Sequence, residues 1–394
     1  MQSKMLAVTP IVLAMQLASF AAIAGDDITQ AITGGKASLD MRYRYENVDQ
    51  DSFADEAQAS TIRTRLGYTT GDFNDLSAMM EMENTSDAGA DDYSPENPGY
   101  PTIGDQTQTE LNQFYLQFAG IEKTQARIGR QRIGLDNSRF VGNAGWRQNE
   151  QTFDAFSVQN ESIESLKLFY GFVNNMQTTA GTKADMETHL LNAQYAGLPF
   201  GTISVYGYLL DYDLASVGTD TQTFGARFTG KSEIGDGMNL FYSAEYANQA
   251  DYADSTNIDT DYWLLEGGIS VAVVTAKLGY EVLGSDNGTA AFQTPLASRH
   301  GFQGWSDVIL VTPNTGVEDL YISADVTVAE MVLTAAYHDF AANDGDLDHG
   351  DEINLGVSKK FGKNYTLGTK YASYNADNLS VDTDKLWILG EVKF

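Results

Sequence analysis

The chain contains no cysteine, so disulfide bonds cannot contribute to its stability. Proline is scarce, with 7 residues in 394, whereas tyrosine and phenylalanine are abundant, with 21 and 19. Aromatic residues are enriched in β-strands and proline is rare inside them, so this composition suits strands more than helices. The fold must therefore be stabilised by side-chain packing or by a lipid bilayer.

Basic residues are also few, because 24 lysines and arginines stand against 54 aspartates and glutamates. The resulting formal net charge of −30 argues against nucleic acid and against anionic lipid as partners. The positions of the few cations are therefore informative, and five arginines fall within residues 127–147.

Residues that could bind a metal ion or perform catalysis do not gather in the sequence. The four histidines are scattered, and no spacing typical of metal ligands appears. The acidic run 343–352 resembles a calcium loop, but His349 and Leu355 occupy the positions that require glycine and glutamate. His338 and Asp339 are neighbours and would lie on opposite faces of a strand, which argues against a hydrolase. We expect neither a cofactor nor an enzyme activity.

Long apolar runs are missing beyond the first 24 residues. In that segment Lys4 supplies a positive charge, residues 5–21 are mostly apolar, and residues 22–24 read AIA. These are the three parts of a secretory signal peptide, and no stop-transfer pattern follows, so we predict cleavage after residue 24. No later run approaches the ~20 apolar residues of a membrane helix, but a transmembrane β-strand needs only ~10 alternating residues.

Polar and apolar residues alternate through most of the chain, which is the pattern of strands with two different faces. Residues 37–45 carry Ala37, Leu39, Met41, Tyr43 and Tyr45 on one face and Ser38, Asp40, Arg42 and Arg44 on the other. We predict eighteen such strands, at 37–45, 60–70, 75–84, 110–119, 124–133, 152–159, 164–174, 187–196, 201–212, 221–229, 238–248, 260–268, 272–282, 318–327, 331–340, 351–360, 364–374 and 385–394.

The connections between these strands are alternately short and long. Short ones include 120–123 and 361–363, and longer, acidic ones include 85–109, 134–151 and 283–317. This asymmetry is typical of an outer-membrane barrel, with short periplasmic turns and longer extracellular loops. We therefore predict an all-β protein in which residues 25–394 form a single transmembrane antiparallel β-barrel in the outer membrane of a Gram-negative bacterium.

The last strand supports this prediction, because its apolar face ends on an aromatic residue. That face carries Leu386, Ile388, Gly390, Val392 and Phe394. A terminal phenylalanine on such a stripe resembles the assembly signature of outer-membrane barrels. Outer-membrane lipid is accordingly an expected partner of the apolar faces.

If the apolar faces meet lipid, the polar faces line a lumen. Arg42 and Arg44 on the first strand and Arg63 and Arg65 on the second would then form a patch of four guanidinium groups at similar heights. Like charges repel, so inward acids, water or a passing anion should offset them. Acids with inward parity are Glu81, Glu83, Glu245, Glu281 and Asp325.

The arginine-rich stretch 127–147 breaks the strand pattern. Arg127 and Arg130 are three residues apart, so a regular strand would place them on opposite faces. A lipid-facing arginine costs roughly 2–4 kcal/mol at the membrane midplane. We therefore predict a β-bulge near Gly129 that turns Arg130 and Arg132 into the lumen.

The loop that follows, 134–151, contains Gly134, Gly142 and Gly145 and could fold back into the channel with Arg139 and Arg147. The alternative is a solvated loop whose arginines pair with acids near the ends of the loop, Glu150 and Asp154.

Two runs, RIGRQRIGLDNSRFVGNAGWRQNEQTFDAF (127–156) and RHGFQGWSDVILVTPNTGVEDLY (299–321), resemble the alginate export family of Gram-negative porins. This resemblance implies an 18-stranded barrel with an arginine-rich lumen suited to a polyanionic uronate chain. Carried over by position, it implies a constriction formed by Arg127, Arg130, Arg132, Asp136, Asn137, Arg139, Trp146 and Arg147. It also implies that His300, Trp305 and Asp307 lie in a folded extracellular segment.

We predict a porin for passive diffusion of small hydrophilic solutes, with an arginine-rich constriction that favours anions such as uronate oligosaccharides. Two alternatives remain open: a non-selective general porin, and a structural or adhesive barrel. A structural barrel would have mostly matched charges and bulky residues closing its bore. The sequence predicts neither the solute nor the oligomeric state.

Overall fold

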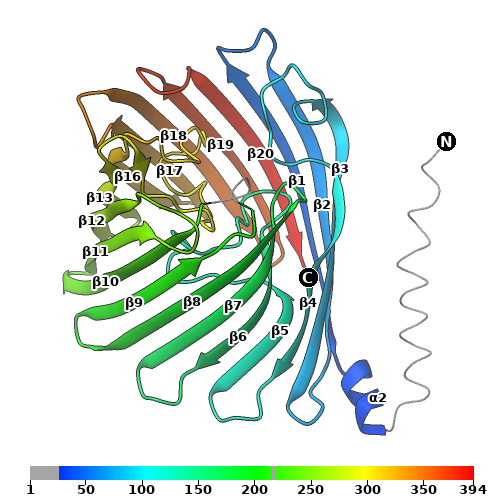
Figure 1. Cartoon of the computed structure of the whole chain (residues 1–394). Helices are drawn as coiled ribbons and strands as arrows, with labels where there is room; N and C mark the ends of the chain where they lie inside the picture. The colour runs from blue at the N-terminus through cyan, green and yellow to red at the C-terminus, as the bar shows by residue number, and fades with distance from the viewer. Residues whose placement is uncertain (1–25, 215–218) are drawn as a thin grey trace.

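The computed structural model describes residues 26–214 and 219–394, which form a closed antiparallel β-barrel of eighteen strands (Figure 1). The predicted signal peptide lies outside the described residues. The barrel strands are β1 (Lys36–Gln50), β2 (Ala57–Thr69), β3 (Leu76–Asp92), β4 (Gln108–Phe118), β5 (Thr124–Gln131), β6 (Thr152–Asn160), β7 (Leu166–Gln177), β8 (Lys183–Leu198), β9 (Gly201–Leu210), β10 (Thr221–Gly235), β11 (Met238–Asp251), β12 (Asp259–Val271), β13 (Val274–Leu283), β16 (Val317–Val328), β17 (Met331–Ala341), β18 (Asp348–Phe361), β19 (Tyr365–Asn375) and β20 (Thr383–Lys393). Each strand pairs with its sequence neighbours, and β20 closes the ring on β1.

The predicted strands are confirmed, since each of the eighteen alternating segments is a barrel strand. Several strands extend beyond the predicted ends; β3, for example, continues to Asp92 through the polar sequence SDAGADD. Such extensions carry no apolar face, so alternation could not reveal them.

Three further elements were not predicted. One is the helix α2 (Asp26–Thr33), which precedes β1 outside the barrel (Figure 1). The other two are β14 (Ser285–Asp286) and β15 (Ala290–Ala291), which form a short hairpin. Among the residues that the structure describes, no helix is long and apolar enough to cross a membrane.

Alternation along the strands separates an apolar outer face from a polar inner face, as predicted. On β1, Met41 and Tyr43 are exposed on the outside, whereas Arg42 and Arg44 between them are buried inside. On β20, Leu386 and Ile388 are exposed on the outer face, and Phe394 continues this stripe beyond the strand. So many exposed apolar side chains would cost free energy in water but not in lipid.

The two ends of the barrel differ in their connections. At the end next to α2, here called the turn end, the connections are short, for example 119–123 and 362–364. At the opposite, loop end, three are long: 93–107, 132–151 and 284–316. Other connections at the loop end, such as 178–182, are short because the strands that they join extend further beyond the rest of the wall. The expectation of long loops therefore holds for only part of this end.

Two of the long connections, 132–151 and 284–316, fold back into the barrel (Figure 1). They are called the lumenal loops below. Val141 and Leu296, one from each loop, are almost fully buried in a single cluster with residues of most of the wall strands from β6 to β19. The core of the protein therefore lies inside the barrel, between the loops and the wall.

Candidate functional site

The lumenal loops bind each other across the interior of the barrel. The Gly142 amide donates to the Leu296 carbonyl at 2.8 Å, and the Ser298 amide donates to the Ser138 carbonyl at 3.0 Å. The Gln151 side chain also donates to the Leu296 carbonyl, at 3.1 Å. These backbone contacts join the two loops into one unit that narrows the bore.

One side of this unit packs on the wall through aromatic rings. Phe140 lies at the centre, with its ring centroid 5.1 Å from Tyr262 and 5.4 Å from Tyr206 of the wall and 5.7 Å from Phe292 of the other loop. Such tilted and edge-on contacts stabilise by about 0.5–1.5 kcal/mol each beyond the area they bury. The loops therefore close the bore on the side of β9 to β12.

The other side faces the predicted arginine patch. Arg42 is paired directly with Arg63 across β1 and β2, and Arg44 and Arg65 lie on the same faces two residues further along their strands, so the four arginines lie at similar heights. The patch consists of Arg42, Arg44, Arg63 and Arg65, and all four side chains are buried. Four buried guanidinium groups are tolerated only if acceptors surround them.

Carboxylates neutralise three members of the patch. The ion pairs are Arg44 with Asp105, Arg63 with Asp40 at 2.5 Å, and Arg65 with Glu83. Arg42 instead donates to the Gln148 side chain at 2.8 Å and to the carbonyls of Gly145 and Arg147. The patch therefore holds the loop 132–151 against the wall.

The arginines of the loop are neutralised in the same way. Arg132 donates to Glu81 and Glu150, Arg139 to Glu281 at 2.6 Å, and Arg147 to Asp307 at 2.5 Å. Removal of one partner from such a buried pair typically costs about 3–5 kcal/mol, because the other charge is left unpaired. The pairing with Glu150 was foreseen in the alternative prediction, but the loop is buried rather than solvated.

His300, Trp305 and Asp307 were expected in a folded extracellular segment, but their loop enters the barrel and they lie in its interior. His300 stacks on Trp146 with ring centroids 4.0 Å apart, and its Nδ1 lies 2.9 Å from Asp307. The Lys370 ammonium on β19 lies 2.7 Å from His300 Nε2 and 3.6 Å from the ring centroid of Trp305. The contacts join both loops to β19.

The His300 ring is neutral in this arrangement. Burial lowers the pKa of the imidazole to about 3, although Asp307 opposes the shift. For Asp307, burial acts to raise the pKa, but His300 and Arg147 hold it well below its usual range. A neutral ring can accept from Lys370 through Nε2 and donate to Asp307 through Nδ1, a tautomer inferred from these contacts.

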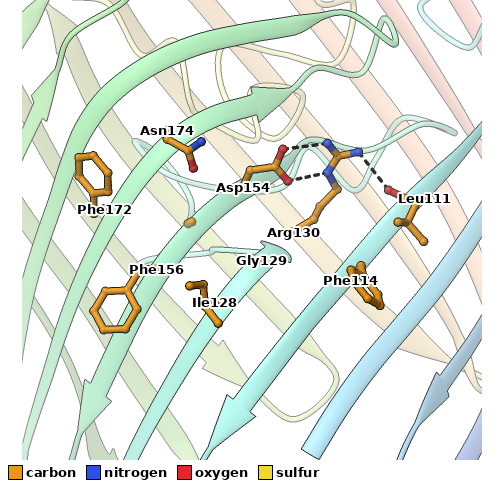
Figure 2. Close-up of a pocket in the computed structure, with 10 residues that line it drawn as sticks. Leu111, Phe114, Ile128, Gly129, Arg130, Asp154, Phe156, Phe172 and Asn174 are labelled. Atoms are coloured by element: carbon orange, nitrogen blue, oxygen red, sulfur yellow. Dashed lines mark hydrogen bonds and ion pairs between the residues drawn. The ribbon is translucent and has the colours of Figure 1, made fainter.

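Arg130 does not lie in the lumen, so this prediction was wrong. The pairing of β5 with β4 and with β6 runs through Gly129 without a register shift, and therefore no residue is inserted there. Figure 2 shows Arg130 on the outer face with Ile128 and Phe156, which are exposed. Its Nε and Nη2 donate to Asp154 at 2.8 and 2.9 Å.

The inserted residues are on other strands. Asn112 of β4 and Asn174 of β7 have no partner in the ladders. Leu111, next to the first bulge, lies beyond the last β4–β5 pair, and its carbonyl accepts from Arg130 Nη1 at 3.1 Å. Arg130 is thus satisfied on the outer face by a carboxylate and a free carbonyl.

Gly129 is irregular without being a bulge. Its φ is +121°, and a Cβ there would lie 2.3 Å from the Phe114 carbonyl oxygen. Only glycine permits this close approach. The glycine at position 129 therefore allows an unusual backbone conformation, and it does not move the following side chains to the other face of the strand.

The remaining predicted residues lie nearer the turn end of the interior. Asp136 is exposed and accepts from Asn192 and Gln194 of β8, and Asn137 beside it is also exposed. Arg127 is half-buried on the inner face, where its Nε donates to Gln117 at 2.8 Å. Its guanidinium also lies 5.0 Å from the ring centroid of Tyr115.

Sequence reasoning missed the partners that position these arginines. Glu150 was named only in the alternative prediction. Asp105, Gln303 and Lys370 were not predicted at all, although each contacts one of these arginines or a neighbouring loop residue. They come from loops without periodicity or from a strand far along the chain. Only their opposite charge or hydrogen-bonding capacity could have suggested them.

The described residues show no group of three or more histidine, aspartate or glutamate side chains that could hold a metal ion.

An 18-stranded barrel with an apolar outer face and two loops folded into its bore is the architecture of an outer-membrane porin. The family model for alginate export matches residues 36–284, so the chain belongs to the alginate export family. Its members are channels, so this protein is a porin of the Gram-negative outer membrane and not an enzyme.

Solved structures share the fold at low sequence identity. Acinetobacter baumannii OccAB2 superposes with a TM-score of 0.74 at 15% identity, covering 93% of this chain and 99% of that chain. Pseudomonas aeruginosa OccD3 (OpdP) gives 0.71 at 16%, covering 93% and 92%. Pseudomonas aeruginosa OpdK with vanillate gives 0.74 at 13%, covering 92% and 99%. A comparison with curated proteins gives no match.

Proposed function

We propose that this porin admits small hydrophilic solutes by passive diffusion and favours anions, such as carboxylated sugars of the uronate type. The observation that carries the proposal is Arg127. It faces the lumen, is half-buried, and has no carboxylate within 4.0 Å among the described residues. Its charge is therefore available to a passing anion, in contrast to the paired arginines of the loops.

The surroundings of Arg127 suit a sugar carboxylate. The neighbouring inward positions of β4 to β7 carry amides and one further cation, namely Gln117, Gln125, Gln159 and Lys167. Amides donate and accept hydrogen bonds with hydroxyl groups, and a guanidinium binds a carboxylate through two parallel bonds. Tyr115 adds a ring face on which a sugar could pack.

The inward side chains of the opposite wall carry negative charge. Across the ring, β16 presents Asp325 and β12 presents Glu266, both inward and both partly accessible. A bore with a cationic wall and an acidic wall orients a solute that carries a carboxylate and several hydroxyls.

The paired arginines favour a second candidate, a porin without ion preference. The charges of the constriction are almost all matched, so this region by itself offers little attraction to either sign. Matched charges together with bulky residues in the bore are also what we expect of a structural barrel. Conductance separates these candidates from the proposal.

Reversal potentials in planar bilayers under a KCl gradient test the proposal. We expect chloride to permeate better than potassium, and Arg127→Gln to reduce that ratio by about fivefold, the Boltzmann factor for ~1 kcal/mol of Coulomb energy. Lys363→Gln, which removes a cation from a turn at the turn end, is the matched control and should leave the ratio unchanged. Equal permeabilities in the unmodified protein would leave the non-selective porin, and absence of single-channel conductance would leave the structural barrel.

A further inference from the structure

A recess of about 500 Å³ lies on the outer face where β4, β5, β6 and β7 meet (Figure 2). Its apolar part is formed by Phe114, Ile128 and Phe156, of which the first two are 54% and 61% exposed. Its polar part, Arg130 with Asp154 and Asn174, lies nearer the loop end. The recess is thus apolar towards the membrane centre and polar towards the outer surface, as is a lipid of the outer leaflet.

The Arg130 guanidinium retains donors for a ligand. It carries five N–H bonds, and three of them are used by the two Asp154 oxygens and the Leu111 carbonyl. One N–H on each terminal nitrogen therefore has no acceptor among the described residues. Two donors on adjacent nitrogens form the fork that binds phosphate, and the side chain is 15% exposed.

Charge at the loop end singles out this sector of the barrel. The outward positions near the loop end carry mostly acids, and these include Asp49, Asp185, Glu187, Asp261, Glu318, Asp351 and Asp384. Within the described residues, the outward cations at this end are Arg130 and Lys183, the exposed first residue of β8. Most of the rim therefore repels an anionic lipid, as the net charge predicts, and the attraction in this sector comes mainly from Arg130, because Asp185 and Glu187 lie on the same face of β8 as Lys183.

Cavity size alone does not distinguish the recess. A second recess of about 460 Å³ lies on the outer face of β6 to β10, where Leu168, Leu191 and Val205 contribute to its lining. No charged side chain lines it. The distinguishing feature of the first recess is therefore its ion pair, which a lipid-facing strand would otherwise avoid.

We propose that the recess is a binding site for one anionic glycolipid of the outer leaflet. Its phosphate group accepts from Arg130 and the Asn174 amide, with Lys183 contributing charge above them. An acyl chain lies over Phe114, Ile128 and Phe156. The site is on the outside of the barrel and is independent of the solute that passes through the lumen.

Native mass spectrometry of the full chain in detergent tests this site with lipid A as the probe. We expect one bound molecule of diphosphorylated lipid A, held about tenfold more tightly than its dephosphorylated form, the ratio that ~1.4 kcal/mol gives. Arg130→Gln/Asp154→Asn, which removes the ion pair while retaining its shape, should abolish that preference. Lys183→Gln changes only a side chain and leaves the backbone pairing of β8 with β7 intact. It should weaken binding roughly twofold to threefold.

Lys123→Gln is the matched control, because it removes an exposed cation at the turn end. Binding that is equal for both forms of the lipid, or equal in all variants, would overturn the proposal. A dimer peak that disappears on addition of lipid would do so too, since the recess would then hold a second copy. Resistance of the folded barrel to SDS at room temperature shows whether each variant is folded.

Discussion

The arginines of this porin differ in what satisfies them, and that difference decides their roles. Arg44, Arg63 and Arg65 bind carboxylates and contribute little free charge to the bore, whereas Arg42 binds neutral oxygens. The shared face and similar heights of Arg42 and Arg63 could be predicted from the sequence, because they follow from strand parity and a shared loop. The outward face of Arg130 is the one that regular alternation gives, since β5 has no register shift. Its acceptors could not be predicted, because the free Leu111 carbonyl depends on a bulge at Asn112 that nothing in the local sequence marks.

Arg130 closes the wall where the β4–β5 ladder stops, since it joins the Leu111 carbonyl to Asp154 on β6. Arg130→Gln should therefore lower the free energy of unfolding by about 1–3 kcal/mol, the cost of leaving a charged acceptor unsatisfied. The double variant Arg130→Gln/Asp154→Asn should recover part of this loss. Urea unfolding in lipid vesicles measures both; a double variant less stable than the single one would contradict the role given to the pair.

At the scale of elements, the two lumenal loops behave as one inserted unit. Their backbones bind each other through Gly142 and Leu296, and their side chains bind the wall on both sides. The sequence predicted that the loop 134–151 could fold inwards, because its glycines permit a return of the chain. It could not predict the partner of Arg139, since Glu281 lies on a distant strand and irregular loops carry no period that specifies their contacts.

The docked state of these loops should depend on pH through His300. The pKa of this ring is lowered to about 3 in the docked state, whereas a free histidine has a pKa near 6.5. Below that free value the undocked loop binds a proton that the docked loop does not. Docking is therefore fully stable above about pH 6.5 and weakens as the pH falls, by up to about tenfold per unit until the docked ring also titrates.

Single-channel recordings between pH 7 and pH 4 measure this effect as more frequent transitions between conductance levels. His300→Gln keeps a side chain that can donate and accept hydrogen bonds but removes the titration, so its recordings should change little over the same range. An equal response in the variant and in the unmodified protein would show that another group is responsible.

At the scale of the whole molecule, the barrel wall and the lumenal loops inside it are specified by the sequence in different ways. The wall was predictable from the sequence, because a period of two over eighteen segments specifies strands, faces and neighbours together. The contents were not, because the aromatic cluster around Phe140 and the pair of Arg44 with Asp105 unite segments distant in sequence. Eighteen strands enclose a wide bore, so the loops determine how much of it remains open.

Replacement of residues 290–309 by a short glycine–serine linker should therefore widen the channel without unfolding the wall. These residues contribute β15 and most of the second lumenal loop but no pairing of the eighteen-stranded ring. We expect single-channel conductance to rise roughly threefold or more, towards that of an unobstructed barrel of this size. Unchanged conductance would mean that the narrowest point lies elsewhere.

The ring closes through β1 and β20, with Leu39 and Phe394 exchanging backbone hydrogen bonds at 3.0 and 2.8 Å. These strands are the furthest apart in the chain, so the final pairing has the longest loop to close and the highest entropic barrier. Until it forms, both strands expose unpaired edges that can add to other chains. Assembly of this barrel is therefore most open to aggregation in the interval before β1 and β20 meet, because an unclosed ring is a sheet with two free edges.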